Sequence, residues 1–423
     1  MPLAVADAVA EVLREAAATG VEHVGSEAAR GRVLAADVTS PIDLPPFGNS
    51  AMDGYAVRAR DTAGASAAGP RRLRIVDESR AGAPAAVVVG PGEAAGVSTG
   101  ALLPEGADAV VRVEDTRRGD GGVEIRREVA VGADVRPAGD DVRAGQVVLR
   151  AGTPVGAGER ALLLSVGAPE VAVHRHPRVG IVATGSELVA PGRPLGPGQI
   201  VDSNGAMLAD LVGAHGGAVA RIVSGVADRR DATRAALAAG MDGCDVLVVS
   251  GGVSMGAHDH VRPALAELGA EERYWRIALR PGHPVWFGVR DARGGRTLVF
   301  GLPGNPVSAY VTFQLLVVPA LMRLAGLPGT GRPVVDALYD GDAFTKAAAF
   351  TQAVRCRLDF GDGPPRAVPT SANQRSHALS SLVGVDALVL IPPEIATVRP
   401  GDPVRALMVA DGHRVDIDVT TRM

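Results

Sequence analysis

The chain has 423 residues, a formal net charge of −4 and a hydrophobic content of 47%, so we expect two to four domains with full cores. The weakly acidic balance gives no overall basic field, which argues against nucleic acid as a partner. The two cysteines, Cys244 and Cys356, exclude a disulfide framework and a zinc ligand set, and they fit a reducing cytoplasm.

The N-terminus predicts an amphipathic helix, because its apolar residues recur at helical spacing between Val5 and Leu13. No basic region precedes them, so a signal peptide is not expected. No apolar run reaches the length of a membrane span, and we expect the longest one, residues 313–321, to be broken by Pro319. We therefore expect a cytoplasmic protein without a membrane partner.

The next part of the chain favours strands and turns. Residues 21–43 form a short connecting element with strand character at 32–36. Residues 44–140 are rich in glycine and predict a small β-domain, with a hairpin turn at 119–122. Residues 141–176 are again extended and rich in turns.

Residues 177–325 predict a different architecture. Three apolar runs, 179–183, 246–249 and 298–300, each end in a glycine-rich turn that is followed by a helical pattern. Further helices are expected at 207–212 and 231–239. This alternation predicts a doubly wound, mostly parallel α/β sheet, which binds ligands beyond the carboxyl ends of its strands.

Residues 330–423 return to a β-like pattern, with an apolar run at 387–391 and a turn at 399–402. We expect a small C-terminal β-barrel there.

Three glycine-rich turns, at 184–188, 250–259 and 301–308, are expected to meet at one edge of the α/β sheet. The second is the most informative, because a strand, a turn and a helix there aim backbone N–H groups at one point and form an anion cradle. In the third turn, Pro303 and Pro306 fix the backbone, which suits either a rigid binding loop or a stiff connection to the next helix.

Two carboxylates, Glu187 and Asp259, follow the first and second turns. Beside phosphate-binding amides they would repel a phosphate unless a divalent cation bridged them. Alternatively, both carboxylates interact with helix N-termini. Asp228 lies in another loop at this level, and taken alone it is better explained as a solvated loop acid.

Two other segments suggest binding. Arg276, Arg280 and His283 lie on one segment with two prolines, which suits a tetrahedral oxyanion, although a solvated basic face remains open. Residues 45–57 mix apolar side chains with polar ones between turn signals, which favours insertion into a partner subunit or a pocket. Asp53 in that segment is otherwise a plain turn residue.

Taken in order, these segments resemble the molybdopterin molybdenumtransferase family, the MoeA and gephyrin E-domain group. The resemblance covers nearly the whole chain, through the segments 45–57, 98–101, 104–110, 138–142, 183–188, 198–204, 250–259, 280–284 and 301–308.

The resemblance implies a homodimeric transferase of molybdenum cofactor biosynthesis, which inserts molybdate into adenylylated molybdopterin and releases AMP, with Mg²⁺ as cofactor. It implies an active site between subunits, and it allows the molybdopterin adenylyltransferase as a further partner. It also implies four domains: residues 1–20 with 177–325 for molybdopterin binding, 21–43 with 141–176 for linking and dimerisation, 44–140 as an inserted β-domain, and 330–423 as the C-terminal barrel.

The resemblance also implies roles for residues. Glu187 and Asp259 would hold Mg²⁺. The set that would bind substrate comprises Gly185, Ser186, Ser250, Gly251, Gly252, Arg276, Arg280, His283, Pro303, Asn305, Pro306, Ser308, Ser376 and Arg357, with Arg355 as a less secure alternative to Arg357. Asp53, Thr99, Asp141 and Asp228 resemble catalytic positions of the family. The segments of Asp53 and Thr99 would reach the partner subunit's α/β edge.

The sequence departs from the family pattern at three positions. Gly48 stands where the family often has Asp, and Arg280 and His283 stand where many members have Lys. Arginine keeps the charge, but histidine carries it only part of the time near neutral pH, so we expect a weaker anion site at high pH.

Two other functions stay open. A related α/β domain carries out the preceding adenylyltransferase step, but the appended β-domains and residues 45–57 argue against that step here. A non-catalytic scaffold is the other alternative, because animal relatives combine synthesis with receptor clustering. The acidic and basic pocket residues favour catalysis.

Overall fold

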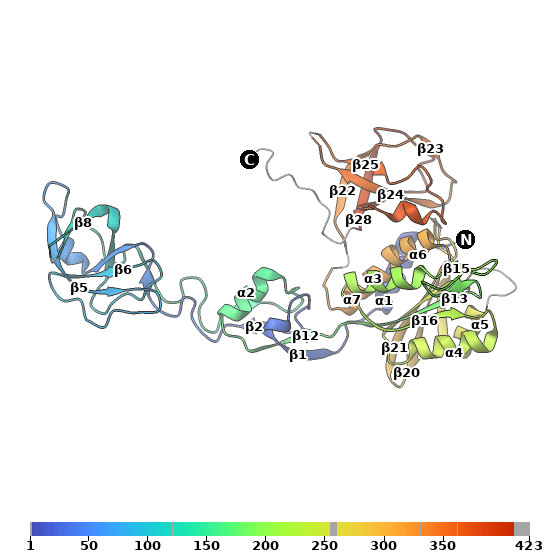
Figure 1. Cartoon of the computed structure of the whole chain (residues 1–423), viewed down its shortest axis with the longest axis horizontal. Coiled ribbons are helices and arrows are strands. Elements are labelled where there is room, and N and C mark those ends of the chain that lie inside the picture. Colours follow the sequence, from blue (N-terminus) through green and yellow to red (C-terminus); the bar gives the residue numbers. More distant parts are fainter. Residues whose placement is uncertain (1, 121, 254–259, 330, 362, 410–423) are drawn as a thin grey trace. The chain divides into compact units, whose positions relative to one another are not determined.

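A computed structural model describes residues 2–120, 122–253, 260–329, 331–361 and 363–409 (Figure 1). The chain divides into two compact units. The first comprises Met1–Glu22, Gly31–Ala35 and Val173–Met423, and the second comprises His23–Arg30 and Ala36–Ala172.

The second unit is built on a six-stranded sheet of order β7-β4-β6-β5-β9-β8. Its core contains Val57, Leu73, Val111 and Ile125. The predicted hairpin is confirmed, since the last two strands pair antiparallel with Gly119 opposite Gly122. The strands are β4 (Gly54–Val57), β5 (Arg71–Ser79), β6 (Glu93–Val97), β7 (Ala109–Arg112), β8 (Thr116–Gly119) and β9 (Gly122–Ile125).

Shorter elements complete the second unit. The pairs β2 (Val38–Thr39) with β11 (Val147–Leu149) and β3 (Asn49–Ser50) with β10 (Val135–Arg136) are antiparallel. The expectation of extended structure throughout 141–176 is wrong at α2 (Ala157–Ser165). This helix begins where the Glu159 carboxylate accepts a hydrogen bond from the Gly156 N–H, at 3.0 Å.

The strand expected at 32–36 is not formed either. Val33 and Leu34 are buried, as their apolar character predicts, but they form isolated bridges, such as that between Leu34 and Val173. The strands β1 (Val21–Gly25) and β12 (Glu170–His174) pair with each other in a two-stranded sheet.

The first unit contains the predicted α/β sheet, of order β16-β13-β17-β21-β20-β18. Its first four strands are parallel, whereas β20 is antiparallel to both of its neighbours, β21 and β18. The mostly parallel sheet is therefore confirmed. The strands are β13 (Arg178–Thr184), β16 (Ala218–Val226), β17 (Val246–Ser250), β18 (Ala270–Trp275), β20 (Trp286–Ala292) and β21 (Gly295–Leu302).

Helices cover both faces of this sheet (Figure 1). On one face lie α1 (Val5–Glu15), α3 (Asn204–Ala214) and the helical segment α6 (Pro306–Thr312) to α7 (Val318–Leu324). On the other face lie α4 (Arg230–Met241) and α5 (Val261–Glu267). The first turn is an exception to the predicted pattern, since it leads into the short strands β14 (Leu188–Val189) and β15 (Ile200–Val201) before α3 begins.

The segment Pro306–Leu324 is long and apolar enough to cross a membrane, but 83% of its most apolar window is buried inside the protein, as in a core helix. We expected Pro319 to interrupt this segment, but it does not. A π-helical stretch, Phe313–Val317, precedes the proline, and Pro319 itself lies in the first turn of α7, where its missing N–H costs little.

The C-terminal part of the first unit is a closed five-stranded barrel, of order β24-β25-β22-β28-β26 with β26 pairing back to β24. Its strands are β22 (Val334–Tyr339), β24 (Thr351–Asp359), β25 (Arg366–Pro369), β26 (Ala387–Ile391) and β28 (Pro403–Met408), and β23 (Phe344–Thr345) pairs outside it with β27 (Thr397–Val398). The predicted barrel is thus confirmed. One strand of the α/β part, β19 (Leu279–Arg280), adds to β24 in parallel.

Candidate functional site

The three predicted turns begin at the carboxyl edge of the α/β sheet, and of the second turn the structure describes residues 250–253. Ala183 of β13 pairs with Ser250 of β17, and Ser250 pairs with Leu302 of β21, so the three strands end side by side. The Gly251 N–H donates to the Leu302 carbonyl at 3.0 Å. Because the strands are parallel and in register, their turns form one rim.

Glycine is required where the second turn crosses the first. Gly251 has a φ of 92°, and a Cβ there would lie 2.7 Å from the carbonyl oxygen of Thr184. Gly252 has a φ of 67°, and its Cβ would lie 2.4 Å from Val261. Only glycine combines these conformations with this close approach.

Asn204, the first residue of α3, links the turns. Its side-chain amide donates to the Ser250 hydroxyl at 2.9 Å and to the Gly304 carbonyl at 2.8 Å. Sequence reasoning quoted the 198–204 segment without selecting this residue. The sequence contained a signal for Asn204, because the amide of an asparagine at the start of a helix can donate hydrogen bonds to two neighbouring turns.

Two carboxylates flank the first turn. The Ser186 N–H donates to Asp228 Oδ2 at 3.2 Å, and the Asp228 N–H donates to the Ser186 hydroxyl at 3.0 Å. Glu187 is exposed and lies in the turn before β14, so it does not sit at a helix N-terminus. Asp259 lies outside the described residues.

A cavity of about 470 Å³ opens between the α/β loops and the barrel. Six of the predicted residues line it together: Arg280, His283, Pro303, Asn305, Ser308 and Ser376. The rest of its lining consists of Pro281, Gly282, Pro284, Gln352, Gln374, Arg375 and His377, none of which sequence reasoning had selected. We call it the oxyanion cavity, because among the described residues its lining holds two arginines, two histidines and no carboxylate.

Hydrogen bonds tie the two walls of the oxyanion cavity together. The Asn305 side chain donates to the Ser376 hydroxyl at 3.2 Å, and the Val307 N–H donates to the Ser376 carbonyl at 3.2 Å. His283 Nδ1 lies 2.8 Å from the Ile277 carbonyl. Since a carbonyl can only accept, Nδ1 carries the proton and Nε2 is the nitrogen left for a ligand.

Two other predicted arginines do not line the oxyanion cavity. Arg276 stacks on Trp275, with its guanidinium carbon 3.9 Å from a ring centroid, and Arg357 is exposed on β24. Arg355 is closer to the cavity wall, because its N–H donates to Gln374 at 3.0 Å. Its buried guanidinium contacts the Ser381 hydroxyl, and desolvation lowers the pKa of Arg355 to about 10.

Asp53 and Thr99 come together in the second unit. Asp53 Oδ1 accepts hydrogen bonds from the Thr99 N–H at 2.7 Å and from its hydroxyl at 3.1 Å. Asp141 is exposed, and its N–H donates to the Leu44 carbonyl at 3.0 Å. A Cβ on Gly48 would make only an ordinary 3.8 Å contact, so packing does not require glycine there.

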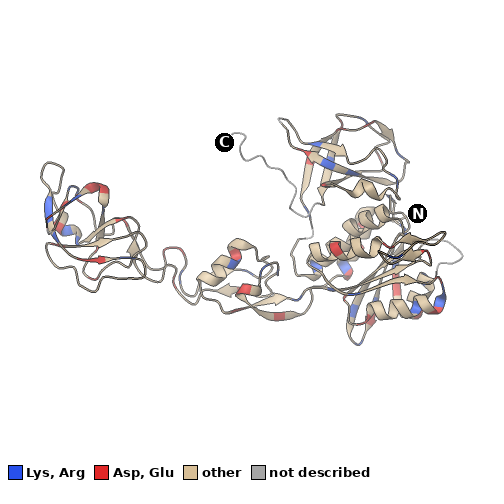
Figure 2. Ribbon diagram, viewed as in Figure 1, with Lys and Arg blue, Asp and Glu red and all other residues tan. Residues whose placement is uncertain are grey.

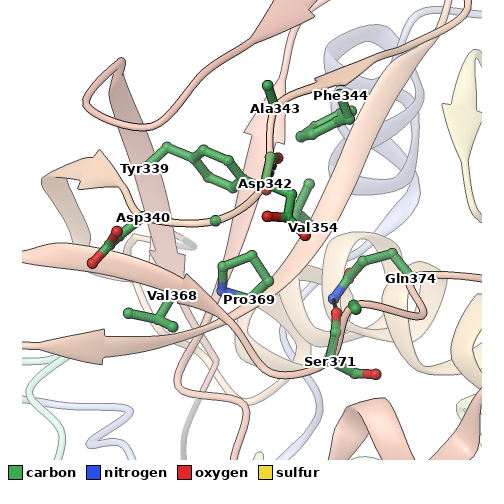
Figure 3. A pocket seen from close by; sticks show the side chains of 12 residues that line it. Tyr339, Asp340, Asp342, Ala343, Phe344, Val354, Val368, Pro369, Ser371 and Gln374 are labelled. Carbon is green, nitrogen blue, oxygen red and sulfur yellow. Dashed lines mark hydrogen bonds between the residues drawn. The ribbon is translucent and has the colours of Figure 1, made fainter.

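The barrel contains a second cavity, of about 360 Å³, that shares Gln374 with the first (Figure 3). Tyr339 and Pro369 line it, and it carries the carboxylates Asp340 and Asp342 without any basic residue. Figure 2 shows acidic and basic residues interspersed in both units, so the basic lining of the oxyanion cavity is a local feature. An oxyanion therefore fits the first cavity and not the second.

Neither cysteine is an activated nucleophile. Burial raises the pKa of the Cys244 thiol, and it raises that of Cys356 to about 12. Both thiols therefore stay protonated near neutral pH and act as core residues.

Three family profiles match the chain in order. They describe the MoeA N-terminal region (domain I and II) over residues 3–167, the probable molybdopterin binding domain over 180–323, and the MoeA C-terminal region (domain IV) over 339–409.

Similar proteins match over almost the whole chain. The molybdopterin molybdenumtransferase of Bacillus subtilis is 34% identical over 97% of this chain and 95% of its own length. Molybdopterin molybdenumtransferase 2 of Mycobacterium tuberculosis is 37% identical over 88% of this chain and 91% of its own. Two crystal structures of the molybdopterin biosynthesis MoeA protein from Pyrococcus horikoshii each give a TM-score of 0.80, at 35% and 29% identity, and cover 96% and 97% of this chain and 99% and 100% of those chains.

Proposed function

This chain belongs to the molybdopterin molybdenumtransferase family of molybdenum cofactor biosynthesis, and from that premise we propose the reaction that it catalyses as a transferase. We propose that it inserts molybdate into adenylylated molybdopterin and releases AMP. The observation that carries this proposal is the oxyanion cavity, where Arg280, His283 and Ser376 converge from two parts of the first unit. A site with fixed cations and no carboxylate suits a tetrahedral dianion such as molybdate.

The third turn supports placing the pterin nucleotide beside this cavity. Its Gly304 carbonyl is held by Asn204 at the turn rim, and a Cβ on Gly304 would lie 3.6 Å from the Gly251 Cα. Its next residue, Asn305, lines the oxyanion cavity. One short loop therefore borders both the anion cradle and the oxyanion cavity. This arrangement suits a substrate that carries a phosphate at one end and a metal-accepting dithiolene at the other.

The residues at the first turn fit Mg²⁺. Mg²⁺ is usually bound by one or two carboxylates together with substrate phosphates, and it would neutralise phosphate charge there. Glu187 is exposed at the rim, and Asp228 is hydrogen-bonded to the neighbouring Ser186. The described residues hold no cluster of three or more His, Cys, Asp or Glu side chains, which agrees with a site completed by the substrate. Asp259 would be the second carboxylate ligand.

The remaining roles follow from the family. We propose a cytoplasmic homodimer in which Asp53 and Thr99 reach the partner subunit's site, with Asp141 as a further functional residue. The hydrogen bonds between Asp53 and Thr99 support a common role for these two, because they fix the carboxylate in one orientation. The molybdopterin adenylyltransferase is proposed as a partner that supplies the substrate.

The test is an assay of AMP release from adenylylated molybdopterin with MgCl₂, with and without molybdate. We expect release that depends on molybdate. Pyrophosphate release from unadenylylated molybdopterin and MgATP would instead favour the adenylyltransferase step. Failure to bind either AMP or molybdate in calorimetry would favour a scaffold.

A further inference from the structure

Phe350, in the turn before β24, lies behind the basic side chains of the oxyanion cavity without lining it. We propose that Phe350 is a positioning residue, whose ring holds Arg280 and His283 in the arrangement that binds the oxyanion. This proposal rests on the proposed function, because it takes the oxyanion cavity as the molybdate site.

The Phe350 ring contacts both of these side chains. The guanidinium carbon of Arg280 lies 4.5 Å from the ring centroid, within the range of a cation–π interaction. The imidazole of His283 meets the ring at 5.3 Å between centroids and an interplanar angle of 82°. One aromatic ring thus contacts both basic residues that the 280–284 segment contributes.

Arg280 needs such a support. Its side chain is exposed, and within the part of the chain that the structure describes it forms no ion pair. A free arginine would lose side-chain conformational freedom on binding an anion. The ring of Phe350 lowers that loss by ordering the guanidinium beforehand.

Lys346, the only lysine of the chain, anchors the turn that carries Phe350. It is 8% exposed, and its Nζ donates to the carbonyls of Phe350 at 2.8 Å and Pro393 at 3.3 Å. The turn needs an anchor because Ala349, which precedes Phe350, has a φ of 69°, a conformation that non-glycine residues rarely adopt. The ammonium group therefore fixes the backbone of Phe350.

Backbone pairing keeps Phe350 next to Arg280. Leu279 and Arg280 of β19 pair with Thr351 and Gln352 of β24, and the Thr351 N–H donates to the Ala278 carbonyl at 2.9 Å. A change in the Phe350 side chain therefore leaves this backbone in place, so its effect can be separated from unfolding.

The test compares Phe350→Leu, which keeps apolar volume and removes the ring, with Phe350→Tyr, which keeps the ring. Measured quantities are the dissociation constant of molybdate by calorimetry, the molybdate KM and kcat of AMP release, the KM of adenylylated molybdopterin, and Tm. We expect Phe350→Leu to weaken molybdate binding about two- to fivefold, because the guanidinium loses one cation–π contact that orders it before the anion binds. The molybdate KM should rise with it, while kcat, the KM of adenylylated molybdopterin and Tm stay near the wild-type values. All quantities of Phe350→Tyr should stay near the wild-type values.

Unchanged molybdate binding in Phe350→Leu, or equal weakening in both variants, would overturn the positioning role. A fall in Tm without a change in molybdate affinity would show that Phe350 only packs. Failure of the proposed function can be distinguished from failure of the positioning role, because the wild-type protein itself would then bind no molybdate in the oxyanion cavity.

A double-mutant cycle tests the anchor. Lys346→Met should weaken molybdate binding, and adding it to Phe350→Leu should give less than the product of the two single effects, since both act through the ring. An effect equal to that product would overturn the role of Lys346. Should Lys346→Met fail to fold, the comparison of the two Phe350 variants still decides on the ring.

Discussion

Arg280 and His283 bring different cations to the oxyanion cavity. The guanidinium is charged throughout the working pH range and can bind two oxygens of one anion. The imidazole is held through Nδ1 by the Ile277 carbonyl, so it meets an anion through Nε2 alone. Arg280, which can bind two oxygens, is therefore expected to supply most of the affinity.

Arg280→Gln should weaken molybdate binding about 10- to 100-fold, because it removes a charge-assisted hydrogen bond worth about 1.5–3 kcal/mol. The measurement is a calorimetric dissociation constant. Arg357→Gln is the matched control, since it removes an exposed arginine from β24, outside the cavity. An equal loss in both variants would point to general electrostatic attraction instead of a site.

Replacing Asn204 by aspartate, the acid of the same shape, should lower activity. Asn204→Asp keeps the shape, but a carboxylate cannot donate to the Gly304 carbonyl and repels it. We expect kcat/KM for adenylylated molybdopterin to fall further in Asn204→Asp than in Asn204→Ala, which loses only the two hydrogen bonds. The reverse order would show that the amide does not hold the third turn.

At the scale of elements, the site depends on close backbone approach between turns. Gly251 lies over Thr184, and Gly304 approaches Gly251 in turn. The first contact leaves no room for a side chain at Gly251, whereas a Cβ on Gly304 would make an ordinary contact. The Asn204 amide then holds the third turn beside the second through Ser250 and Gly304.

Gly251→Ala should destabilise the protein by at least about 3 kcal/mol, since it combines a positive φ with a Cβ 2.7 Å from a carbonyl oxygen. Gly216→Ala is the control, because Gly216 has a φ of 75° but open space around its Cβ. It should cost only about 1 kcal/mol. Urea denaturation of both variants measures the difference, and equal losses would contradict the steric argument.

Three buried parallel strands could be predicted from sequence, but the edge strand β16 and the inner antiparallel strand β20 could not. The runs that became β13, β17 and β21 are continuously apolar because helices cover both faces of the sheet. Most residues of the edge strand β16 are exposed, so it carries no apolar run. In α2 only Leu163 is buried, which leaves too weak a helical stripe to recognise.

The same reasoning applies to the site. The turns and the 276–284 segment could be found because each has a local chemical pattern. The other wall of the oxyanion cavity, with Gln352 and Arg375, depends on how the barrel packs against the α/β part. That packing is fixed by the pairing of β19 with β24, which no local pattern reveals.

At the scale of the whole molecule, the predicted functional residues fall in both units. Arg280, Glu187 and Ser376 belong to the first, and Asp53 and Thr99 belong to the second. In a symmetric dimer, each active site could draw on residues of either subunit. The family resemblance favours a site that combines both subunits.

Mixing two inactive variants tests this shared site. Asp53→Ala and Glu187→Gln should each abolish molybdate-dependent AMP release as pure dimers. Refolded together in equal amounts, half of the dimers would be mixed, and each would hold one intact site of two, so about a quarter of wild-type activity should return. Absence of recovery, with mixed dimers present, would place both residues in the same subunit's site.

The pairing of β19 with β24 also bears on how such enzymes can be recombined. The barrel does not end at its own strands, because its sheet continues into residues 279–280 of the preceding α/β part. Arg280 takes part in this strand pairing, opposite Gln352, and its side chain also lines the oxyanion cavity. A chimera that exchanges the barrel alone would replace one of the two paired strands. Its oxyanion cavity would then be formed by segments of two different proteins that did not evolve together.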